Sequence, residues 1–210
     1  MHRVTEEQLQ KMGQMAVANI DDTLGRNRAI DSSIRPVNDQ ALIGRAYTVS
    51  TDPGDNLFIY HAINQAQAGD ILMVDAKGFT NRAVCGEIVG RMMLAKGLAG
   101  LVVDGAIRDL DALKELPLPV YAKGISPNGP LKNGKGKVQG VISIGGQVVH
   151  PGDLVRGDGD GVIILRPDEV DQSIRDTEEV EADEAMKIAN LKEGKLPDLS
   201  WVEETIKNLD

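Results

Sequence analysis

The sequence predicts an α/β fold with a parallel βαβαβ core, a C-terminal half rich in antiparallel strands and a C-terminal helical arm. From Ile71 to Gly124, apolar runs alternate with stretches of helical periodicity, the pattern of a parallel sheet joined by right-handed helical crossovers. After Gly124 the chain becomes rich in glycine and turns, which favours antiparallel strands. From Asp168 to Glu193 it is highly charged with a thin apolar stripe, which is typical of a surface helix.

The elements before the core are a helix, a strand and a second helix. Thr5, followed by two glutamates, predicts the start of one helix whose apolar positions recur at helical spacing and which ends near Gly25. The run GRAYTVST, residues 44–51, predicts a strand. Residues 55–70 predict a helix capped by Asp55.

The core is predicted to consist of three strands and two crossover helices. The strands are residues 71–76, 100–105 and 118–124, and the helices are about 84–96 and 108–116. The segments KVQGVISIGG, QVVHPGDLVRGD and GVIILRP then predict antiparallel strands that close a second sheet or a barrel wall.

The arm follows within the same predicted domain. We expect residues 1–210 to form one domain, with a helical arm from about residue 168. A helix packed on its own domain and an arm that reaches a neighbouring subunit both fit this pattern. The stripe comprises Val170, Ile174, Val180, Met186 and Leu191.

Composition excludes several classes of partner. The net charge of -9 repels phosphate backbones, so we expect no nucleic-acid partner. No apolar run approaches the ~20 residues that span a bilayer, and the N-terminus lacks the pattern of a signal peptide, so we expect a cytoplasmic protein with no membrane partner. Cys85 is the only cysteine, which excludes an intramolecular disulfide and favours a buried structural thiol.

Two glycine-rich motifs are predicted to be turns. GDGDG, residues 157–161, lacks the spaced ligands of a calcium loop, and KNGKGKVQG, residues 132–140, does not open a helix. No Gly-x-Ser-x-Gly elbow or Walker loop occurs. With three separated histidines and one cysteine, any metal is expected to be bound by oxygen, as Mg²⁺ or Mn²⁺ are.

The candidate site lies at the exit of a buried strand. Arg108 and Asp109 follow that strand by a short turn, and Glu87, separated from Arg108 by 20 residues, lies in the first turn of the preceding helix. Because parallel crossovers bring the carboxyl ends of strands to one edge, we expect these side chains to meet there. The backbone N–H groups of Ile88 and Val89 at the same helix start would bind an anion.

Two interpretations of these residues stay open on spacing alone. Asp109 can ligate a metal, Glu87 can hold metal-bound water and Arg108 can stabilise an oxyanion, which together suit enolate formation from a 2-oxo acid. Alternatively, Asp109 favours the start of its own helix through the helix dipole, and Arg108 forms a surface ion pair with Asp104 or Asp111.

The segments GRAYTV, AGDILMVDAKG, GEIVGRMMLAKGLAGLVVDGAIRD, LPVYAKGISP and VVHPGDLVRGDGDGVIIL carry a wider resemblance. With them, the chain resembles the class II, metal-dependent 4-hydroxy-4-methyl-2-oxoglutarate aldolase family, which shares its fold with the regulator of ribonuclease activity A. The resemblance extends from about Gly44 to Gly194 and implies a swivelling β/β/α-type domain. The family signature is an Asp, 20 residues and then Arg-Asp, so Glu87 departs from it.

The resemblance also implies roles for the site residues. Asp109 would bind Mg²⁺ or Mn²⁺ directly, while Glu87 and a neighbouring subunit's Glu184 would act through water. Arg108 would stabilise the pyruvate enolate and, with the backbone of Gly86, Glu87, Ile88 and Val89, hold the substrate.

The implied reaction is retro-aldol cleavage of a 4-hydroxy-2-oxo acid through a metal-bound enolate, with oxaloacetate decarboxylation as a side activity. The implied assembly is a homotrimer or hexamer. The alternative is a non-catalytic regulator that binds and inhibits a ribonuclease. A Schiff-base aldolase using Lys77 or Lys123 ranks lower, and a methyltransferase lacks a glycine-rich nucleotide loop.

Overall fold

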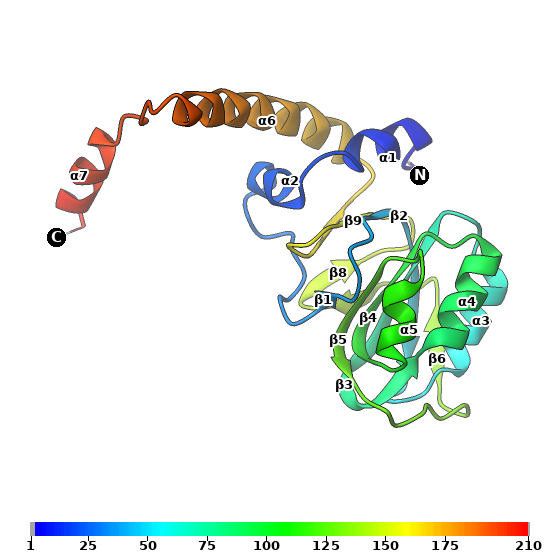
Figure 1. Ribbon diagram of the computed structural model, residues 1–210. Coiled ribbons are helices and arrows are strands. Elements are labelled where there is room, and N and C mark those ends of the chain that lie inside the picture. Colours follow the sequence, from blue (N-terminus) through cyan, green and yellow to red (C-terminus); the bar gives the residue numbers. More distant parts are fainter. Residues whose placement is uncertain (1–2, 210) are drawn as a thin grey trace.

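The centre of the computed structural model, which describes residues 3–209, is an eight-stranded sheet (Figure 1). Its strand order is β1-β5-β4-β3-β2-β9-β10, and β6 pairs with the carboxyl half of β2. β7 and β8 form a separate two-stranded sheet. The strands are β1 (Arg35–Pro36), β2 (Leu42–Thr51), β3 (Asp70–Cys85), β4 (Gly100–Ile107), β5 (Val120–Ile125), β6 (Gly136–Val138), β7 (Ile142–Ile144), β8 (Gln147–Val149), β9 (Leu154–Gly157) and β10 (Val162–Leu165).

The predicted parallel core is confirmed. β2, β3, β4 and β5 are parallel neighbours, and the crossovers between β3, β4 and β5 contain α4 (Glu87–Lys96) and α5 (Leu110–Glu115). Every residue of β4 is buried, because a central parallel strand is covered on both faces. The carboxyl ends of these four strands therefore share one edge of the sheet.

β3 is longer than predicted and shifts the start of the next helix. After Asp75 the strand continues to Cys85 through register shifts against β4, with Ala83 opposite Ala106 and Cys85 opposite Ile107. The helix predicted from about residue 84 consequently begins at Glu87. Irregular pairing of this kind is common next to functional sites, where a bulge changes the direction of a side chain.

The antiparallel half is distributed differently from the prediction. β6, β9 and β10 extend the main sheet instead of closing a second one, and only β7 and β8 pair apart from it. The reason is the length of β2, whose free edge pairs with β9 along its amino half and with β6 along its carboxyl half. Within GDGDG, Asp158 N–H donates to Gly161 O at 3.0 Å, which confirms the predicted turn between β9 and β10.

The first predicted helix is two helices. Thr5 caps α1 (Glu6–Met12) in a reciprocal pair with Gln8, as the sequence indicates. The chain then leaves the helix at Gly13, and α2 (Val17–Thr23) begins after an extended Ala16. One helix across both segments was therefore wrong, although Met12 and Ile20 are both buried as its apolar stripe predicted.

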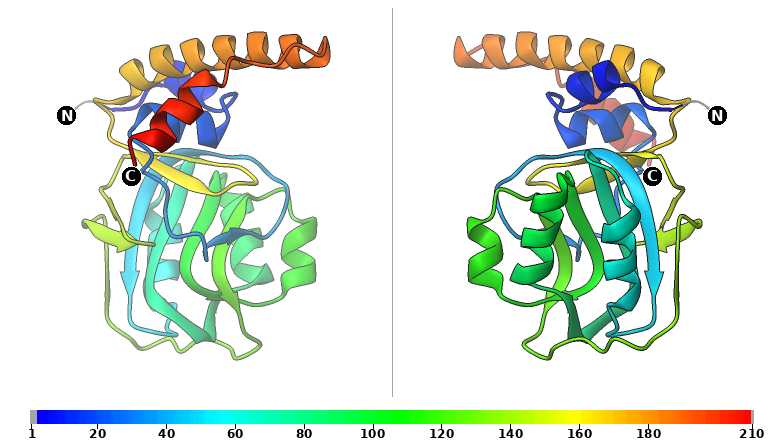
Figure 2. Two further views of the ribbon diagram at one scale, coloured as in Figure 1. Left: turned by 90° about the vertical axis from the view of Figure 1, so that its left-hand side faces the viewer. Right: turned by 90° about the vertical axis from the view of Figure 1, so that its right-hand side faces the viewer.

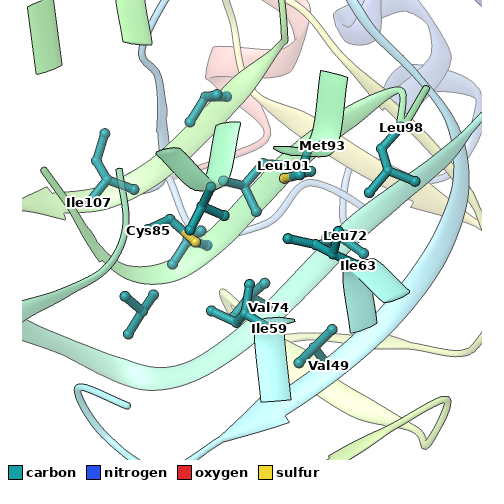
Figure 3. Packing of buried hydrophobic residues seen from close by; sticks show 14 of the residues in the cluster. Val49, Ile59, Ile63, Leu72, Val74, Cys85, Met93, Leu98, Leu101 and Ile107 are labelled. Atoms are coloured by element: carbon teal, nitrogen blue, oxygen red, sulfur yellow. The ribbon is translucent and has the colours of Figure 1, made fainter. Parts of the chain in front are cut away.

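Three apolar clusters hold these layers together. α3 (Leu57–Gln65), α4 and α5 cover one sheet face, where Leu72 and Val74 point into the cluster shown in Figure 3. Ile71 and Met73 alternate to the other face and pack against β7 and β8. The third cluster lies between α1, α2, β9, β10 and the start of α6 (Val170–Lys192), above the sheet in Figure 2.

The C-terminal arm leaves the body along α6. Its first turns are packed, with Val170, Ile174 and Thr177 buried, whereas the helix beyond Ala182 is exposed. α7 (Ser200–Lys207) follows at the far end of the arm (Figure 1). None of the helices within residues 3–209 combines the length and the apolarity needed to cross a bilayer.

Candidate active site

The structure brings Glu87, Arg108 and Asp109 to the carboxyl edge of β3 and β4. Arg108 N–H donates to Cys85 O at 2.9 Å, and Glu87 N–H donates to Asp109 Oδ2 at 3.0 Å. The ends of two adjacent parallel strands are thus tied together by one backbone bond and one side-chain bond. Ligands of open α/β sheets usually bind at this edge.

The side chain of Asp109 serves a helix other than its own. Asp109 immediately precedes α5 but makes no side-chain cap there, and its carboxylate bonds to the first residue of α4. Its backbone is left-handed, with φ 57° and ψ 44°, which costs a residue with a Cβ on the order of 1 kcal/mol or more. The hydrogen bond of the Asp109 carboxylate therefore goes to the start of α4 and not to its own helix.

Gly86 makes this contact sterically feasible. A Cβ atom built on Gly86 would lie 2.4 Å from Asp109 Oδ2 and 2.9 Å from Arg108 Cγ. The backbone φ of Gly86 is -161°, which any residue can adopt, so the requirement for glycine here is one of space. The carboxylate can approach the start of α4 only because this side chain is absent.

Arg108 lies beside the same carboxylate. Its Nε is 3.7 Å from Asp109 Oδ2, and its side chain is 41% exposed. The predicted surface pair with Asp104 is wrong, because Asp104 pairs with Lys123 at 3.2 Å and accepts Gly145 N–H at 3.1 Å. The Nε edge of the Arg108 guanidinium thus faces Asp109, while the side chain stays partly exposed and can contact a ligand.

Glu87 and Glu184 have other partners in this chain. Arg91, one turn further along α4, places Nη2 2.7 Å and Nε 2.8 Å from Glu87 Oε1. Glu184 Oε2, on α6, accepts a hydrogen bond from Asn19 Nδ2 at 2.8 Å. α6 packs on α1 and α2 at the amino end of the sheet, so Glu184 does not meet the site of its own chain.

A pocket of about 230 Å³ lies at this edge. Its cationic groups, Arg108 and Lys132, outnumber the single carboxylate of Asp109, so an anionic ligand is favoured there. The N–H groups of Ile88 and Val89 have no backbone or side-chain acceptor among residues 3–209. The pocket is lined by Asn56, Tyr60, Val84, Cys85, Gly86, Ile88, Val89, Arg108, Asp109, Gly129, Pro130 and Lys132.

Three polar side chains of this lining were not predicted as site residues from the sequence. Asn56 and Tyr60 belong to the segment after β2, and Lys132 lies in the motif interpreted only as a basic turn. Lys132 Nζ lies 5.6 Å from the centre of the Tyr60 ring. One feature could have indicated Asn56 and Tyr60. The strand before them, β2, is parallel to β3, so the residues after the carboxyl end of β2 lie at the same edge of the sheet as Glu87.

The oxygen donors at the pocket fit a hard divalent cation. Asp109 offers a carboxylate, and the buried Oδ1 of Asn56 has no hydrogen-bond partner while its Nδ2 donates to Val84 O at 3.1 Å. No cluster of three or more His, Cys, Asp and Glu that could hold a metal occurs within residues 3–209. This set suits Mg²⁺, which typically keeps several waters and binds few carboxylates.

The two lysines considered for a Schiff base lie elsewhere. Lys77 Nζ bonds to Asp75 Oδ2 at 2.6 Å and to Ser50 Oγ at 2.9 Å, and Lys123 pairs with Asp104. Neither lines the pocket. Ion pairing to a carboxylate opposes the neutral amine that a nucleophilic lysine needs, so a lysine-based aldolase has no support at this edge.

A larger cleft of about 690 Å³ lies at the opposite end of the sheet, near the starts of β2 and β3. Two of its arginines are paired with carboxylates. Arg45 bonds to Glu6 at 2.6 Å, and Arg166 bonds to the fully buried Asp153 at 2.7 Å. None of the predicted site residues lines this cleft, so its size alone does not make it the reaction site.

Comparison with known proteins gives relatives over most of the chain. The family model described as RraA-like, Aldolase/RraA, matches residues 17–164. A protein of Halalkalibacterium halodurans, whose name assigns it provisionally as a 4-hydroxy-4-methyl-2-oxoglutarate aldolase, is 34% identical over 188 residues, which are 89% of this chain and 90% of that protein.

Solved structures give the same fold. The structure of RraA from Thermus thermophilis, described as an RNA-processing inhibitor, is 29% identical with a TM-score of 0.67 and covers 72% of this chain and 93% of its own. An uncharacterized protein from Pseudomonas syringae pv. tomato is 23% identical and has a TM-score of 0.83 over 93% of this chain and 97% of its own. The second likeness concerns the fold alone.

Proposed function

This chain belongs to the RraA-like family, which contains aldolases and RraA proteins, and from this premise we propose that it is a divalent-metal-dependent lyase. Its substrates are 4-hydroxy-2-oxo acids resembling 4-hydroxy-4-methyl-2-oxoglutarate, and its product is pyruvate. The observation that carries the proposal is the contact of Asp109 with the start of α4, beside Arg108 and two free N–H groups.

Substrate binding uses the positive end of α4. The carboxylate of the 2-oxo acid accepts hydrogen bonds from the N–H groups of Ile88 and Val89, because the first turn of a helix has unsatisfied donors and a favourable dipole. Gly86 leaves room for this approach. Lys132 also lines the pocket and attracts the second carboxylate of a dicarboxylic substrate.

Bond cleavage requires removal of one proton and stabilisation of one oxyanion. The 4-hydroxyl proton leaves, C4–O becomes a carbonyl, and the electron pair of the C3–C4 bond forms the C2–C3 double bond of the pyruvate enolate. Arg108 stabilises the negative charge on the enolate oxygen. Protonation at C3 then gives pyruvate, and oxaloacetate decarboxylation proceeds through the same enolate.

Asp109 would hold Mg²⁺ or Mn²⁺, with the buried Oδ1 of Asn56, which lines the same pocket, as a further oxygen donor. When bound, such a cation supplies Lewis-acid polarisation of the 2-oxo group. Glu87 orients a water that takes the hydroxyl proton, which requires its carboxylate to turn away from Arg91. Glu184 of a neighbouring subunit adds a second carboxylate near this water, in a homotrimer or a hexamer.

The test is pyruvate release from 4-hydroxy-4-methyl-2-oxoglutarate and from oxaloacetate with added Mg²⁺. We expect activity that EDTA abolishes, that Mg²⁺ restores and that Arg108→Ala lowers by at least about 10²-fold. Lys114→Ala, on the surface of α5, is the matched control. Full activity in EDTA or in Arg108→Ala would exclude this mechanism.

A second candidate function is regulation of a ribonuclease by binding. It is favoured by the likeness to the Thermus RraA, although more than a quarter of this chain lies outside that match. The acidic arm suits a basic partner. A chain that captures a purified ribonuclease, slows its cleavage of RNA and releases no pyruvate would support this function instead.

A further inference from the structure

The loop of residues 126–134, which follows β5, forms part of the pocket wall. It supplies three residues of the lining, namely Gly129, Pro130 and Lys132. Its first half is attached to β3, because Ala83 N–H donates to Asn128 O at 2.9 Å and Asn128 Nδ2 donates to Asn81 O at 2.9 Å. The irregular part of β3 that continues beyond Asp75 therefore holds this wall in place.

Arg82, on the same part of β3, holds the loop at Gly129. Arg82 Nη1 donates a hydrogen bond to Gly129 O. The stem of Arg82 packs closely on Gly54, in the turn after β2, where an added Cβ would lie 2.9 Å from Arg82 Cδ. Arg82 forms no ion pair within residues 3–209. Its guanidinium therefore joins two segments beside the site and does not neutralise a carboxylate.

Gly129 also lies against Arg108. A Cβ atom built on Gly129 would lie 2.8 Å from Arg108 Nη1 and 3.7 Å from Arg108 Cζ. On the opposite edge of the guanidinium, Arg108 Nε is 3.7 Å from Asp109 Oδ2, which exceeds a hydrogen-bond distance. The Arg108 side chain donates no hydrogen bond to any acceptor in the part of the chain that the structure describes. Its donors are therefore available to the oxyanion of a ligand.

The bond from Arg82 fixes the direction of the Gly129 carbonyl. A hydrogen bond from a guanidinium is roughly twice as strong as one between neutral groups, so this oxygen favours a cationic donor over water. If the Arg82 donor were removed, Arg108 would be the cation in contact with Gly129, and the carbonyl would turn toward it. Arg82 thus keeps the Arg108 donors unpaired until a ligand binds, as a preorganised oxyanion site requires.

We propose that Arg82 is a positioning residue of the lyase, which holds the Gly129 carbonyl away from Arg108 and so keeps the Arg108 guanidinium free for the enolate oxygen. Arg82 does not line the pocket and acts only through Gly129 and Arg108. The inference rests on the proposed function for the enolate. The arrangement of the two arginines around Gly129 does not depend on that function.

Kinetics in two backgrounds test whether Arg82 acts through Arg108. Arg82→Met keeps an apolar stem on Gly54 but removes the donor, so kcat for pyruvate release should fall at least about tenfold while KM stays within about threefold. In Arg108→Ala the same change should cost less than about twofold, because the guanidinium that it affects is absent. An equal fold loss in both backgrounds would overturn the proposal.

Two further variants complete the kinetic test. Arg82→Lys keeps a cationic donor for the Gly129 carbonyl and should retain kcat within about threefold of the original. Arg35→Met, which changes an exposed arginine of β1 outside the pocket, is the matched control and should leave kcat and KM unchanged. A loss of kcat in Arg82→Lys as large as that in Arg82→Met would contradict the role of the donor.

The crystal structure of Arg82→Met tests the contact without turnover. We expect Gly129 O to lie within hydrogen-bond distance of an Arg108 nitrogen in this variant, whereas Arg82→Lys should keep the original direction of the carbonyl. An Arg82→Met structure in which the Gly129 carbonyl keeps that direction would overturn the proposal. A turned carbonyl in a chain that releases no pyruvate would contradict the lyase and leave the positioning of Arg108 intact.

Discussion

The carboxylate of Asp109 accepts the backbone N–H of Glu87 at 3.0 Å, so the residue that precedes α5 holds the first turn of α4. Asp109 therefore has two roles that can be tested separately. One is structural, because the N–H at a helix start needs an acceptor. The other, in the proposed lyase, depends on its negative charge.

Asp109→Asn separates these duties. The amide oxygen can still accept the Glu87 N–H, and Asn tolerates the left-handed backbone, so the free energy of unfolding should stay within about 1 kcal/mol of the original. Loss of the charge should lower kcat for pyruvate release at least about 10²-fold. Asp111→Asn, on the exposed side of α5, is the control. Full kcat in Asp109→Asn would show that the negative charge of Asp109 is not needed and that its role is structural only.

Gly86→Ala tests the steric requirement. The new Cβ would lie 2.4 Å from Asp109 Oδ2, so the carboxylate must move and lose its bond to the start of α4. We expect kcat/KM to fall at least about tenfold, with a loss of stability of roughly 1–3 kcal/mol from overpacking. Gly159→Ala, whose Cβ would meet nothing within 4 Å, should change neither quantity. Unchanged kinetics in Gly86→Ala would show that the close approach is dispensable.

Two variants of Glu87 test its proposed role in orienting the water that takes the hydroxyl proton. Glu87→Gln keeps a similar shape but loses the basic carboxylate, so kcat should fall by roughly 10²–10⁴-fold. Glu87→Asp restores the residue that the family signature carries and should retain activity within about tenfold. Because the exposed pair with Arg91 contributes only a few tenths of a kcal/mol, neither variant should change Tm appreciably. Equal kcat values in Glu87→Gln and Glu87→Asp would contradict a role of the Glu87 carboxylate in the reaction.

The parallel core and the meeting of Glu87 with Asp109 were predictable, because both depend on strand direction and spacing. The partner of the Asp109 carboxylate was not predictable, since a helix-start aspartate normally caps its own helix. The structure shows that the left-handed backbone of Asp109 and the space at Gly86 redirect it. Such a conformation of a residue with a Cβ has no signature in sequence spacing.

Asn56 and Lys132 escaped prediction for another reason. They come from segments more than 70 residues apart and meet through Asp55, whose carboxylate binds both the start of α3 and the loop after Lys132. Periodicity reports on local structure, whereas this contact depends on tertiary packing. The break between α1 and α2 belongs to the same class, because an apolar stripe continues across Gly13 although the helix does not.

Cys85 should be inert in the folded protein. The thiol is buried, and this burial raises its pKa to about 12, so the thiolate that reacts with alkylating reagents is scarce at pH 8. We expect iodoacetamide to label the native chain roughly 10³-fold more slowly than the urea-unfolded chain. Mass spectrometry of the labelled peptide gives both rates. Fast labelling of the native chain would contradict the burial of this thiol.

Asp55 gives a prediction for stability and pH together. Burial alone would raise the pKa of its carboxyl group, but the N–H groups of Leu57, Asn133 and Gly134 donate to the carboxylate at 2.7–2.8 Å and together lower the pKa below its usual value. In Asp55→Asn the amide nitrogen would face donors that it cannot satisfy. We expect a loss of roughly 2 kcal/mol at pH 7 and a higher KM, because the loop that carries Lys132 loosens.

The sign of the pH dependence follows from the lowered pKa of Asp55. The folded state holds this proton less tightly than the unfolded state does, so the stabilisation is complete well above pH 3.8 and is lost as the pH falls through and below that value. The original chain and Asp55→Asn are unfolded with urea at pH values from 7 to 3. The difference between their urea midpoints should narrow below about pH 4. Asp52→Asn should cost less, because Asp52 accepts only one N–H, that of Lys135 at the edge of the same loop, and the amide oxygen of Asn can still accept it. Equal midpoints at pH 7 would show that Asp55 does not hold the loop.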